Sequence, residues 1–188
     1  LSDAPFRAKE KVRTTCLALG FTEAMHHSFL SAAELDAFDA RPATKAARLA
    51  LPDPVSADYG VLRDSLLPQL LGSLGRNAAN QLETASLFEI GRVFGVAKDG
   101  KTPVEGERLA LGFVGPVGRP ALDRRRAVTA EEAVLWLKGA VETLVERLHA
   151  GHLEFRTGDH PAFSAGAAPT VLLNGRPLRF RGVNRHDF

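Results

Sequence analysis

The sequence predicts an α+β fold in which an antiparallel sheet of about six strands is flanked by helices near residues 4–19, 65–80 and 130–149. Two kinds of hydrophobic pattern lead to this prediction. The helical segments repeat apolar residues every three or four positions, which places those residues on one face of a helix. Several segments between them alternate apolar and polar residues, as half-buried strands do.

Composition places the chain among soluble globular proteins of single-domain size. It has 188 residues, of which 45% are hydrophobic and 24% are charged. We expect residues 1–188 to be one module of a longer protein, because the chain begins without Met. The net charge of +2 argues against nucleic-acid binding over the whole surface. The single cysteine, Cys16, favours a reducing compartment. Charged residues interrupt every long apolar run, so neither a membrane span nor a signal peptide is predicted.

The first helix and the strand after it follow from one continuous pattern. Asp3 or Ser2 can cap the helix, Pro5 fits its first turn, and Gly20 can end it in a left-handed conformation. Residues 21–29 then alternate as in a strand. The helix face contains Ala8, Val12, Cys16 and Leu19, and the strand presents Met25, His27 and Phe29 on one side and Ala24, His26 and Ser28 on the other.

Residues 58–94 are the stretch around which the rest of the chain is organised. Asp64 or Ser65 can cap a helix there, and Pro68 lies in its first turn, where no helical N–H bond is lost. Residues 87–94 are apolar with a polar interruption, as in a half-buried strand. The apolar face of the helix consists of Leu67, Leu70, Leu71, Leu74 and Ala78.

Shorter signals predict the remaining elements. Ser31 with Glu34, and Thr129 with Glu132, have the spacing of a capping box at the start of a helix. The pair Asn174-Gly175 predicts the tight turn of a hairpin. Further strands are expected at residues 48–51, 108–114 and 153–156, with a glycine- and lysine-rich turn at residues 95–107.

The polar residues form no recognisable metal or nucleophile site. His26 and His27 are neighbours in a strand and therefore point to opposite faces, which prevents them from holding one metal ion together. Cys16 has no partners at the spacing of zinc ligands. Glu89 and Arg92 are expected to form ion pairs with other strands or loops.

Arg63 stands just before a predicted helix N-terminus, where a cation is unfavourable to the helix dipole. Its position predicts a carboxylate partner from another strand or subunit. A surface arginine that fixes its own loop is the alternative. The basic run at residues 124–126, with Arg119 nearby, could contact nucleic-acid phosphates, although a solvated loop is the interpretation that such charge runs favour.

Two motifs resemble one known family. Residues 61–71 read VLRDSLLPQLL and residues 87–94 read LFEIGRVF. In this order and at this spacing they resemble the β subunit of bacterial phenylalanyl-tRNA synthetase. The resemblance covers residues 6–180 and implies the antiparallel sheet of class II synthetases in a catalytic-like module that does not carry out catalysis. Further similar segments lie at residues 19–29, 137–144 and 160–165.

The resemblance implies a role in assembly. In the family this module joins a catalytic α subunit in an (αβ)2 heterotetramer, which attaches phenylalanine to tRNA(Phe) in the cytoplasm, and the α subunit binds ATP and Mg²⁺. The arginine motifs that hold ATP in class II enzymes are not matched, because residues 89–92 have the inverted order and residues 106–112 give only a fragment. No catalytic, cofactor-binding or metal-binding residue is therefore expected. The interface residues that the resemblance implies are Val12, Cys16, Leu19, Met25 and His27, and Arg63 is added to them from its place before the helix N-terminus.

Two other interpretations stay open. The chain could be a stand-alone protein-binding module that has lost its synthetase partner. Residues 173–188 resemble the segment that enters the barrel of family-2 β-galactosidases, which suggests a glycosidase fragment, although the paired catalytic carboxylates of such an enzyme are missing. Copurification with a synthetase α subunit would separate the first interpretation from the assembly role.

Overall fold

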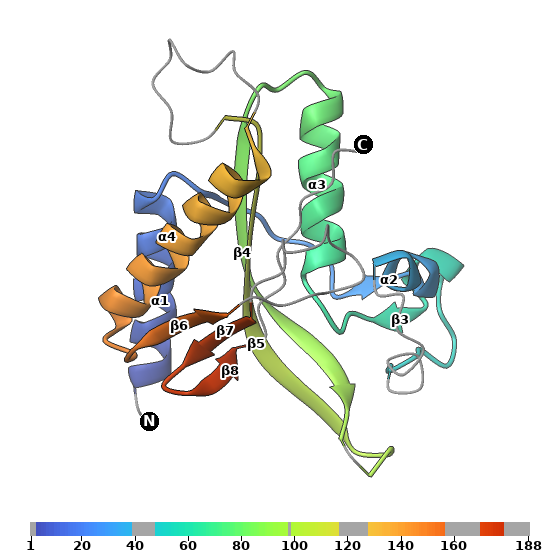
Figure 1. The fold of residues 1–188 in the computed structure, drawn as a ribbon. Helices are drawn as coiled ribbons and strands as arrows, with labels where there is room; N and C mark the ends of the chain where they lie inside the picture. Colours follow the sequence, from blue (N-terminus) through green and yellow to red (C-terminus); the bar gives the residue numbers. More distant parts are fainter. Residues whose placement is uncertain (1–2, 39–47, 98, 117–127, 157–169, 179–188) are drawn as a thin grey trace.

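The computed structural model describes residues 3–38, 48–97, 99–116, 128–156 and 170–178. Within these ranges helices pack on both faces of a long two-stranded hairpin, so the predicted α+β class is confirmed (Figure 1). The helices are α1 (Ala4–Ala18), α2 (Ala32–Phe38), α3 (Leu67–Ala79), α4 (Ala130–Leu148) and the 3-10 helix η2 (Ala57–Tyr59). The strands are β1 (Thr22–Glu23), β2 (Phe29–Leu30), β3 (Val61–Leu62), β4 (Ala85–Val96), β5 (Pro103–Val114), β6 (Leu153–Arg156), β7 (Thr170–Leu173) and β8 (Arg176–Leu178).

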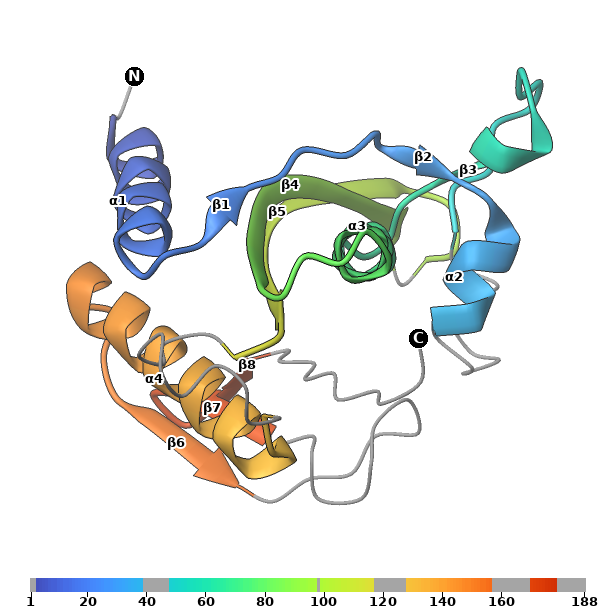
Figure 2. The same ribbon diagram turned by 90° about the horizontal axis from the view of Figure 1, so that it is seen from above.

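Strands β4 and β5 form the centre of the fold. They pair antiparallel along their whole length, from Ala85 opposite Val114 to Val96 opposite Pro103. The hairpin is longer than the sequence predicted, because residues 95–96 and 103–107 continue the strands instead of forming a turn. Alternate side chains point to opposite faces. Figure 2 shows α3 on one face of the hairpin and α1 and α4 on the other.

The face toward α1 and α4 holds the larger aromatic core. Phe88 of β4 is fully buried against Cys16, Phe21, Ala140 and Leu144. The indole of Trp136 lies 4.9 Å, between ring centroids, from each of the rings of Phe21 and Phe113. Burying one such side chain contributes about 1.5–3 kcal/mol. Contacts with this core therefore fix α1 and α4 to the sheet.

The opposite face has small residues because α3 approaches the sheet closely. A Cβ atom added at Gly112 would lie only 2.7 Å from Cδ1 of Leu74 on α3. Leu66, Leu70, Val93 and Ala110 form the buried apolar cluster between α3 and the hairpin. A larger side chain at position 112 would push the helix away from the sheet.

The described strands do not form the single antiparallel sheet of about six strands that was predicted. They hydrogen-bond in separate groups, β1-β4-β5, β2-β3 and β6-β7-β8, and β1 runs parallel to β4. Residues 21–29 are not one continuous strand either. The reason is that side chains and a distant loop take the backbone bonds of this segment: the N–H of His26 donates to Glu89 (3.3 Å), and the carbonyl of Ser28 accepts from the N–H of Arg63 (2.9 Å).

The two capping boxes are confirmed, since Ser31 and Thr129 each exchange bonds with the glutamate three residues later. At α3 the N-cap is Leu66, and Ser65, rather than Asp64, accepts a bond from the N–H of Leu67 (3.3 Å). Asp3 stands at the N-cap of α1 but its side chain accepts no capping bond, and Ser2, the other expected cap, lies outside the described residues.

The expected turns and short strands can be compared with the described backbone. The strands expected at residues 108–114 and 153–156 are confirmed, the first as part of β5 and the second as β6. The left-handed end of α1 is confirmed by Gly20 (φ +85°). The tight turn between β7 and β8 is confirmed by Asn174 (φ +51°) and Gly175 (φ +75°). The strand expected at residues 48–51 is reduced to one bridge, between Ala50 and Val61. Among the helices that the structure describes, none has both the length and the apolar character to span a bilayer.

Candidate functional site

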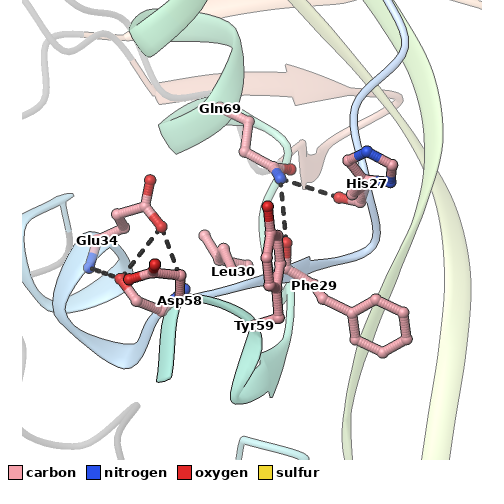
Figure 3. Close-up of a pocket in the computed structure, with 8 residues that line it drawn as sticks. His27, Phe29, Leu30, Glu34, Asp58, Tyr59 and Gln69 are labelled. Atoms are coloured by element: carbon pink, nitrogen blue, oxygen red, sulfur yellow. Dashed lines mark hydrogen bonds between the residues drawn. The ribbon is translucent and has the colours of Figure 1, made fainter. Parts of the chain in front are cut away.

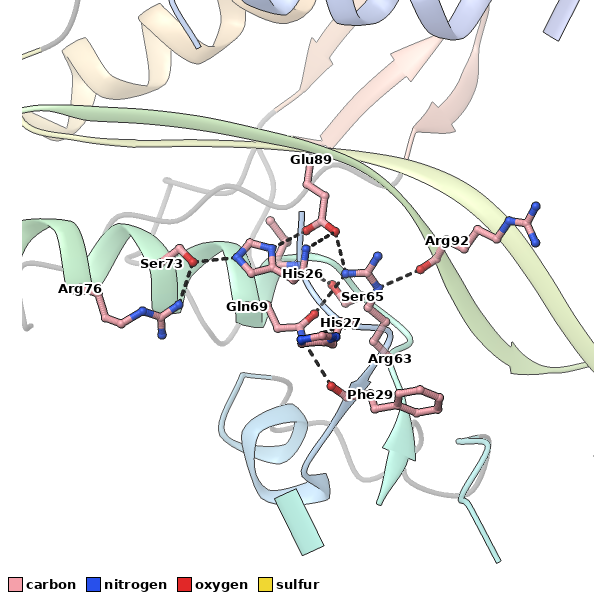
Figure 4. Close-up of polar contacts among 11 residues, drawn as sticks. His26, His27, Phe29, Arg63, Ser65, Gln69, Ser73, Arg76, Glu89 and Arg92 are labelled. Carbon is pink, nitrogen blue, oxygen red and sulfur yellow. Dashed lines mark hydrogen bonds and ion pairs between the residues drawn. The ribbon is translucent and has the colours of Figure 1, made fainter. Parts of the chain in front are cut away.

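A partly buried group of polar side chains lies between α3 and the hairpin (Figure 4). We call it the polar cluster; its members are His26, Arg63, Gln69, Ser73 and Glu89. They come from four parts of the chain. His26 lies in the segment between β1 and β2, Arg63 follows β3, and Glu89 is on β4. Gln69 and Ser73 are four residues apart on α3 and so lie on one helix face.

The centre of the polar cluster is an ion pair between Arg63 and Glu89. Nη1 of Arg63 lies 2.7 Å from Oε1 of Glu89, and these residues are only 3% and 2% exposed. The guanidinium also donates from Nε to the carbonyl of Arg92 (2.9 Å) and from Nη1 to Oε1 of Gln69 (3.2 Å). Two charges so deeply buried are stable only because each is paired and hydrogen-bonded.

Position 91 of β4, two residues after Glu89, has no room for a side chain, which is why it is a glycine. A Cβ atom there would clash with Nη2 of Arg63 and would lie 3.1 Å from Oε1 of Glu89. The two sequence motifs, VLRDSLLPQLL and LFEIGRVF, therefore meet in the fold: Arg63 of the first donates to Glu89 and to the carbonyl of Arg92 in the second, over Gly91, and Gln69 of the first accepts from Arg63.

His26 extends the polar cluster toward α3. Its Nδ1 lies 2.7 Å from Oε2 of Glu89, and its Nε2 lies 2.7 Å from Oγ of Ser73, which also accepts from Nη2 of Arg76 (2.8 Å). A carboxylate can only accept, so Nδ1 carries the proton when the ring is neutral, and Ser73 donates its hydroxyl proton to Nε2. Every member of this chain of bonds is then satisfied.

The order Ser73, His26, Glu89 is that of a serine-hydrolase relay, but its surroundings do not suit that chemistry. Ser73 lies in the middle of α3, where backbone N–H groups are bonded within the helix and cannot stabilise an oxyanion. The hydroxyl oxygen of Ser73 also already accepts a hydrogen bond from Arg76. The polar cluster thus holds α3, β4 and the loop before α3 together, and it is a structural centre.

The structure separates the predicted interface residues into two groups. Cys16 is 0% exposed, and Val12 and Leu19, which are partly buried, pack against the same core as Cys16. The subunit contact expected for these three residues stays a prediction. Burial, with a smaller effect of Glu23, raises the pKa of the Cys16 thiol to about 11. Phe6 and Leu17 remain exposed on α1, so that helix keeps apolar side chains outside its own core.

Met25 and His27 are exposed, whereas Arg63 is buried. Met25 is 92% exposed and His27 lies on the same outward side of the segment before β2. Arg63 has the carboxylate partner that its position predicted, and the partner comes from another strand of the same chain. Arg63 thus acts inside the module, and the subunit contact expected for it stays a prediction.

The arginines that could have belonged to an ATP site have other partners. Arg92 is exposed and pairs across the hairpin with Glu105 (3.3 Å), and Nη1 of Arg108 donates to the carbonyl of Glu107 (2.8 Å). The predicted ion pairs of Glu89 and Arg92 are confirmed. The described ranges hold no group of three or more His, Cys, Asp or Glu side chains arranged for a metal ion. The basic run at residues 119–126, His160 and the last ten residues lie outside the described residues.

A second feature, which the sequence did not predict, is a pocket of about 320 Å³ beside the polar cluster (Figure 3). Gln69 connects the two, because its Nε2 donates to the carbonyls of His27 (2.9 Å) and Phe29 (3.4 Å) while its Oε1 accepts from Arg63. The sequence had singled out His27 as an interface residue and Ser31 with Glu34 as a capping box, but no pattern indicated a pocket between them. The lining residues are His27, Phe29, Leu30, Ser31, Glu34, Asp58, Tyr59 and Gln69.

Two solved structures with a similar fold carry the names of a tRNA synthetase and a tRNA ligase subunit. The chain is similar to "PylSc, a pyrrolysyl tRNA synthetase" from Desulfitobacterium hafniense, with a TM-score of 0.70 at 18% identity over 93% of this chain and 55% of that one. It is also similar to a histidine–tRNA ligase subunit from Alicyclobacillus acidocaldarius, with a TM-score of 0.60 at 12% identity over 79% of this chain and 39% of that one. These similarities confirm the class II synthetase-like fold.

Relatives by sequence are subunits of one ligase. The chain is 32% identical over 180 residues to the phenylalanine–tRNA ligase beta subunit of Bacillus subtilis (strain 168), covering 95% of this chain and 22% of the relative. It is 36% identical over 169 residues to the same subunit of Xanthomonas campestris pv. campestris (strain 8004), covering 87% and 20%. The chain thus spans about a fifth of the length of these relatives. Residues 2–183 match the family described as "Phenylalanyl tRNA synthetase beta chain CLM domain", and the chain belongs to that family.

Proposed function

We propose that this chain is the non-catalytic module of the β subunit of phenylalanine–tRNA ligase and that it acts by assembling with the catalytic α subunit. The complete enzyme attaches phenylalanine to tRNA(Phe) in the cytoplasm with ATP and Mg²⁺, which the α subunit holds. The β-subunit relatives and the family match support the identity of the module.

The observation that carries the non-catalytic role is the Arg63–Glu89 ion pair. A synthetase needs cationic side chains that are free to receive the phosphates of ATP, because negative charge develops on them in the transition state. On the α3 face of the sheet, the buried guanidinium of Arg63 is already neutralised by Glu89. Side chains of α3 lie so close to the sheet at Gly112 that they leave no space there for a ligand. The module keeps the fold of a synthetase, but its buried arginine and glutamate bind each other instead of a nucleotide.

Exposed apolar side chains support the assembly role. Phe6 and Leu17 on α1 and Met25 before β2 lie on the helix and strand that the resemblance relates to subunit contacts. Large apolar side chains that remain outside the core of a module are typical of surfaces that bind other proteins. We therefore place the α-subunit contact on this side, with Met25 and His27 rather than Cys16 and Arg63.

Native mass spectrometry of the chain mixed with the α subunit from the same source tests the proposal. We expect one α chain for each copy of this module, and a mass of two α and two β chains when the complete β subunit is used. A mixture in which both chains keep their separate masses would refute the assembly role and favour the stand-alone binding module. A charge-matched protein of similar size serves as the control for non-specific association.

A further inference from the structure

The pocket beside the polar cluster combines three features that suit one kind of ligand. Two carboxylates, Glu34 and Asp58, lie on its rim, and both are exposed. The ring of Tyr59 is 48% exposed and stands next to them, with Phe29 on the far side (Figure 3). Among the described residues that line it, none is a lysine or an arginine. The pocket therefore has a formal charge of about −2 at neutral pH beside an aromatic surface.

The walls of the pocket are held in place by the rest of the fold. Arg48 has a nearly buried side chain and connects Asp36 of α2 (2.7 Å) with Asp64 before α3 (3.5 Å). Strand β2 pairs with β3, and Gln69 binds the carbonyls of His27 and Phe29. Because the walls are fixed before binding, little ordering is required when a ligand enters.

We propose that this pocket binds an arginine side chain of the partner α subunit. A guanidinium is planar, can stack on the ring of Tyr59 and can donate to both carboxylates at once, whereas an ammonium group cannot stack in this way. This inference rests on the proposed function, because it takes the ligand from the partner subunit.

A protein ligand is favoured over a small solute because the pocket is continuous with a row of exposed side chains, two of which are apolar. Met25, His27 and Phe29 point outward from one segment, and His27 and Phe29 also line the pocket. Arginine, methionine and aromatic residues are enriched where protein interfaces are buried, and an arginine in an aromatic and acidic pocket is a typical centre of binding energy. A segment of the partner can then lie along the row and insert one arginine.

The variants that test the pocket remove charge and leave the fold intact. Glu34→Gln keeps the capping box of α2, since glutamine can accept the same bonds from Ser31 at this helix position. Asp58→Asn keeps an oxygen for Ser56. The matched control is Glu83→Gln, which removes an exposed carboxylate that does not line the pocket. Circular dichroism and thermal unfolding of each variant confirm the fold.

Binding to the α subunit is measured first by titration calorimetry. We expect each pocket substitution to weaken binding by about fivefold and the double variant by more than tenfold, as for exposed ion pairs of up to about 1 kcal/mol each. Glu83→Gln should bind like the unmodified chain. If the double variant binds the α subunit as tightly as the unmodified chain, the inference is overturned and the assembly role stands. If the unmodified chain does not bind the α subunit at all, the assembly role fails.

A second titration decides the chemistry of the pocket without the α subunit. Nα-acetylargininamide is added to the isotope-labelled chain, and Nα-acetylcitrullinamide, its neutral analogue, is the control. We expect saturable NMR shifts at Glu34, Asp58 and Tyr59 with the arginine compound, and no such shifts with citrulline or in the double variant. Equal shifts with both compounds, or shifts confined to residues outside the pocket, would overturn the proposal.

Discussion

Replacing Arg63 by methionine removes the cation from the polar cluster and leaves Glu89 buried without its partner. The charge on Glu89 keeps only its contacts with His26, while the carbonyl of Arg92 and the amide oxygen of Gln69 lose a donor. Breaking a buried ion pair in this way costs about 3–5 kcal/mol. Domains of this kind are stable by about 5–15 kcal/mol, so Arg63→Met should remove a large part of the free energy of unfolding.

Urea unfolding of four proteins measures the coupling: the unmodified chain, Arg63→Met, Glu89→Gln and the double variant. The double variant buries no unpaired charge, so we expect it to be more stable than the sum of the single effects predicts, by about 2–3 kcal/mol. Arg92→Met is the matched control, because Arg92 pairs with Glu105 at the surface, and it should cost less than about 1 kcal/mol. Additive effects, or a cost for Arg63→Met as small as that of the control, would refute the central place given to this pair.

Three further predictions concern single positions. Gly91→Ala should destabilise the chain by about 1–3 kcal/mol in urea unfolding, because the new methyl group meets Arg63. Gly95→Ala, where the nearest side-chain atom would lie 3.9 Å away, should have little effect. The thiol of Cys16 should react with iodoacetamide about 100-fold more slowly in the folded chain than in urea, because burial raises its pKa to about 11; equal rates would contradict its burial. Since the folded chain then holds this proton more tightly than the unfolded chain, stability should fall as the pH rises from about 9 to about 11. Thr129→Ala removes the capping box of α4 and should lower the melting temperature by an amount equivalent to about 1 kcal/mol, whereas an unchanged value would show that the cap is not needed.

Local sequence patterns were enough to place the helices. The three predicted helices agree with α1, α3 and α4 to within about two residues, because each has an apolar face and a clear start or stop signal. The cap of α4 was found from Thr129 and Glu132 alone, because a capping box depends only on residues three apart. Features that depend on neighbours in the sequence were therefore predictable.

Features that depend on contacts between residues far apart in the sequence could not be predicted. Residues 21–29 alternate like a strand, yet the side chain of Glu89, 63 residues beyond His26, takes the bond that a strand would use. The role of Cys16 could not be decided from the face of α1, because that face packs either on a partner or on α4, and only the fold shows that it packs on α4. Arg63 was recognised as unusual from the helix dipole, but its partner could be assigned only when β4 was in place.

Binding of ATP to the isolated chain tests most directly whether this module retained a synthetase scaffold without its nucleotide site. Calorimetric titration with Mg²⁺ and ATP up to millimolar concentration should give no saturable heat for the chain alone, and saturable binding should be found with the α subunit. Saturable binding of ATP to the chain alone, abolished by Arg92→Met but not by Glu83→Gln, would contradict this account.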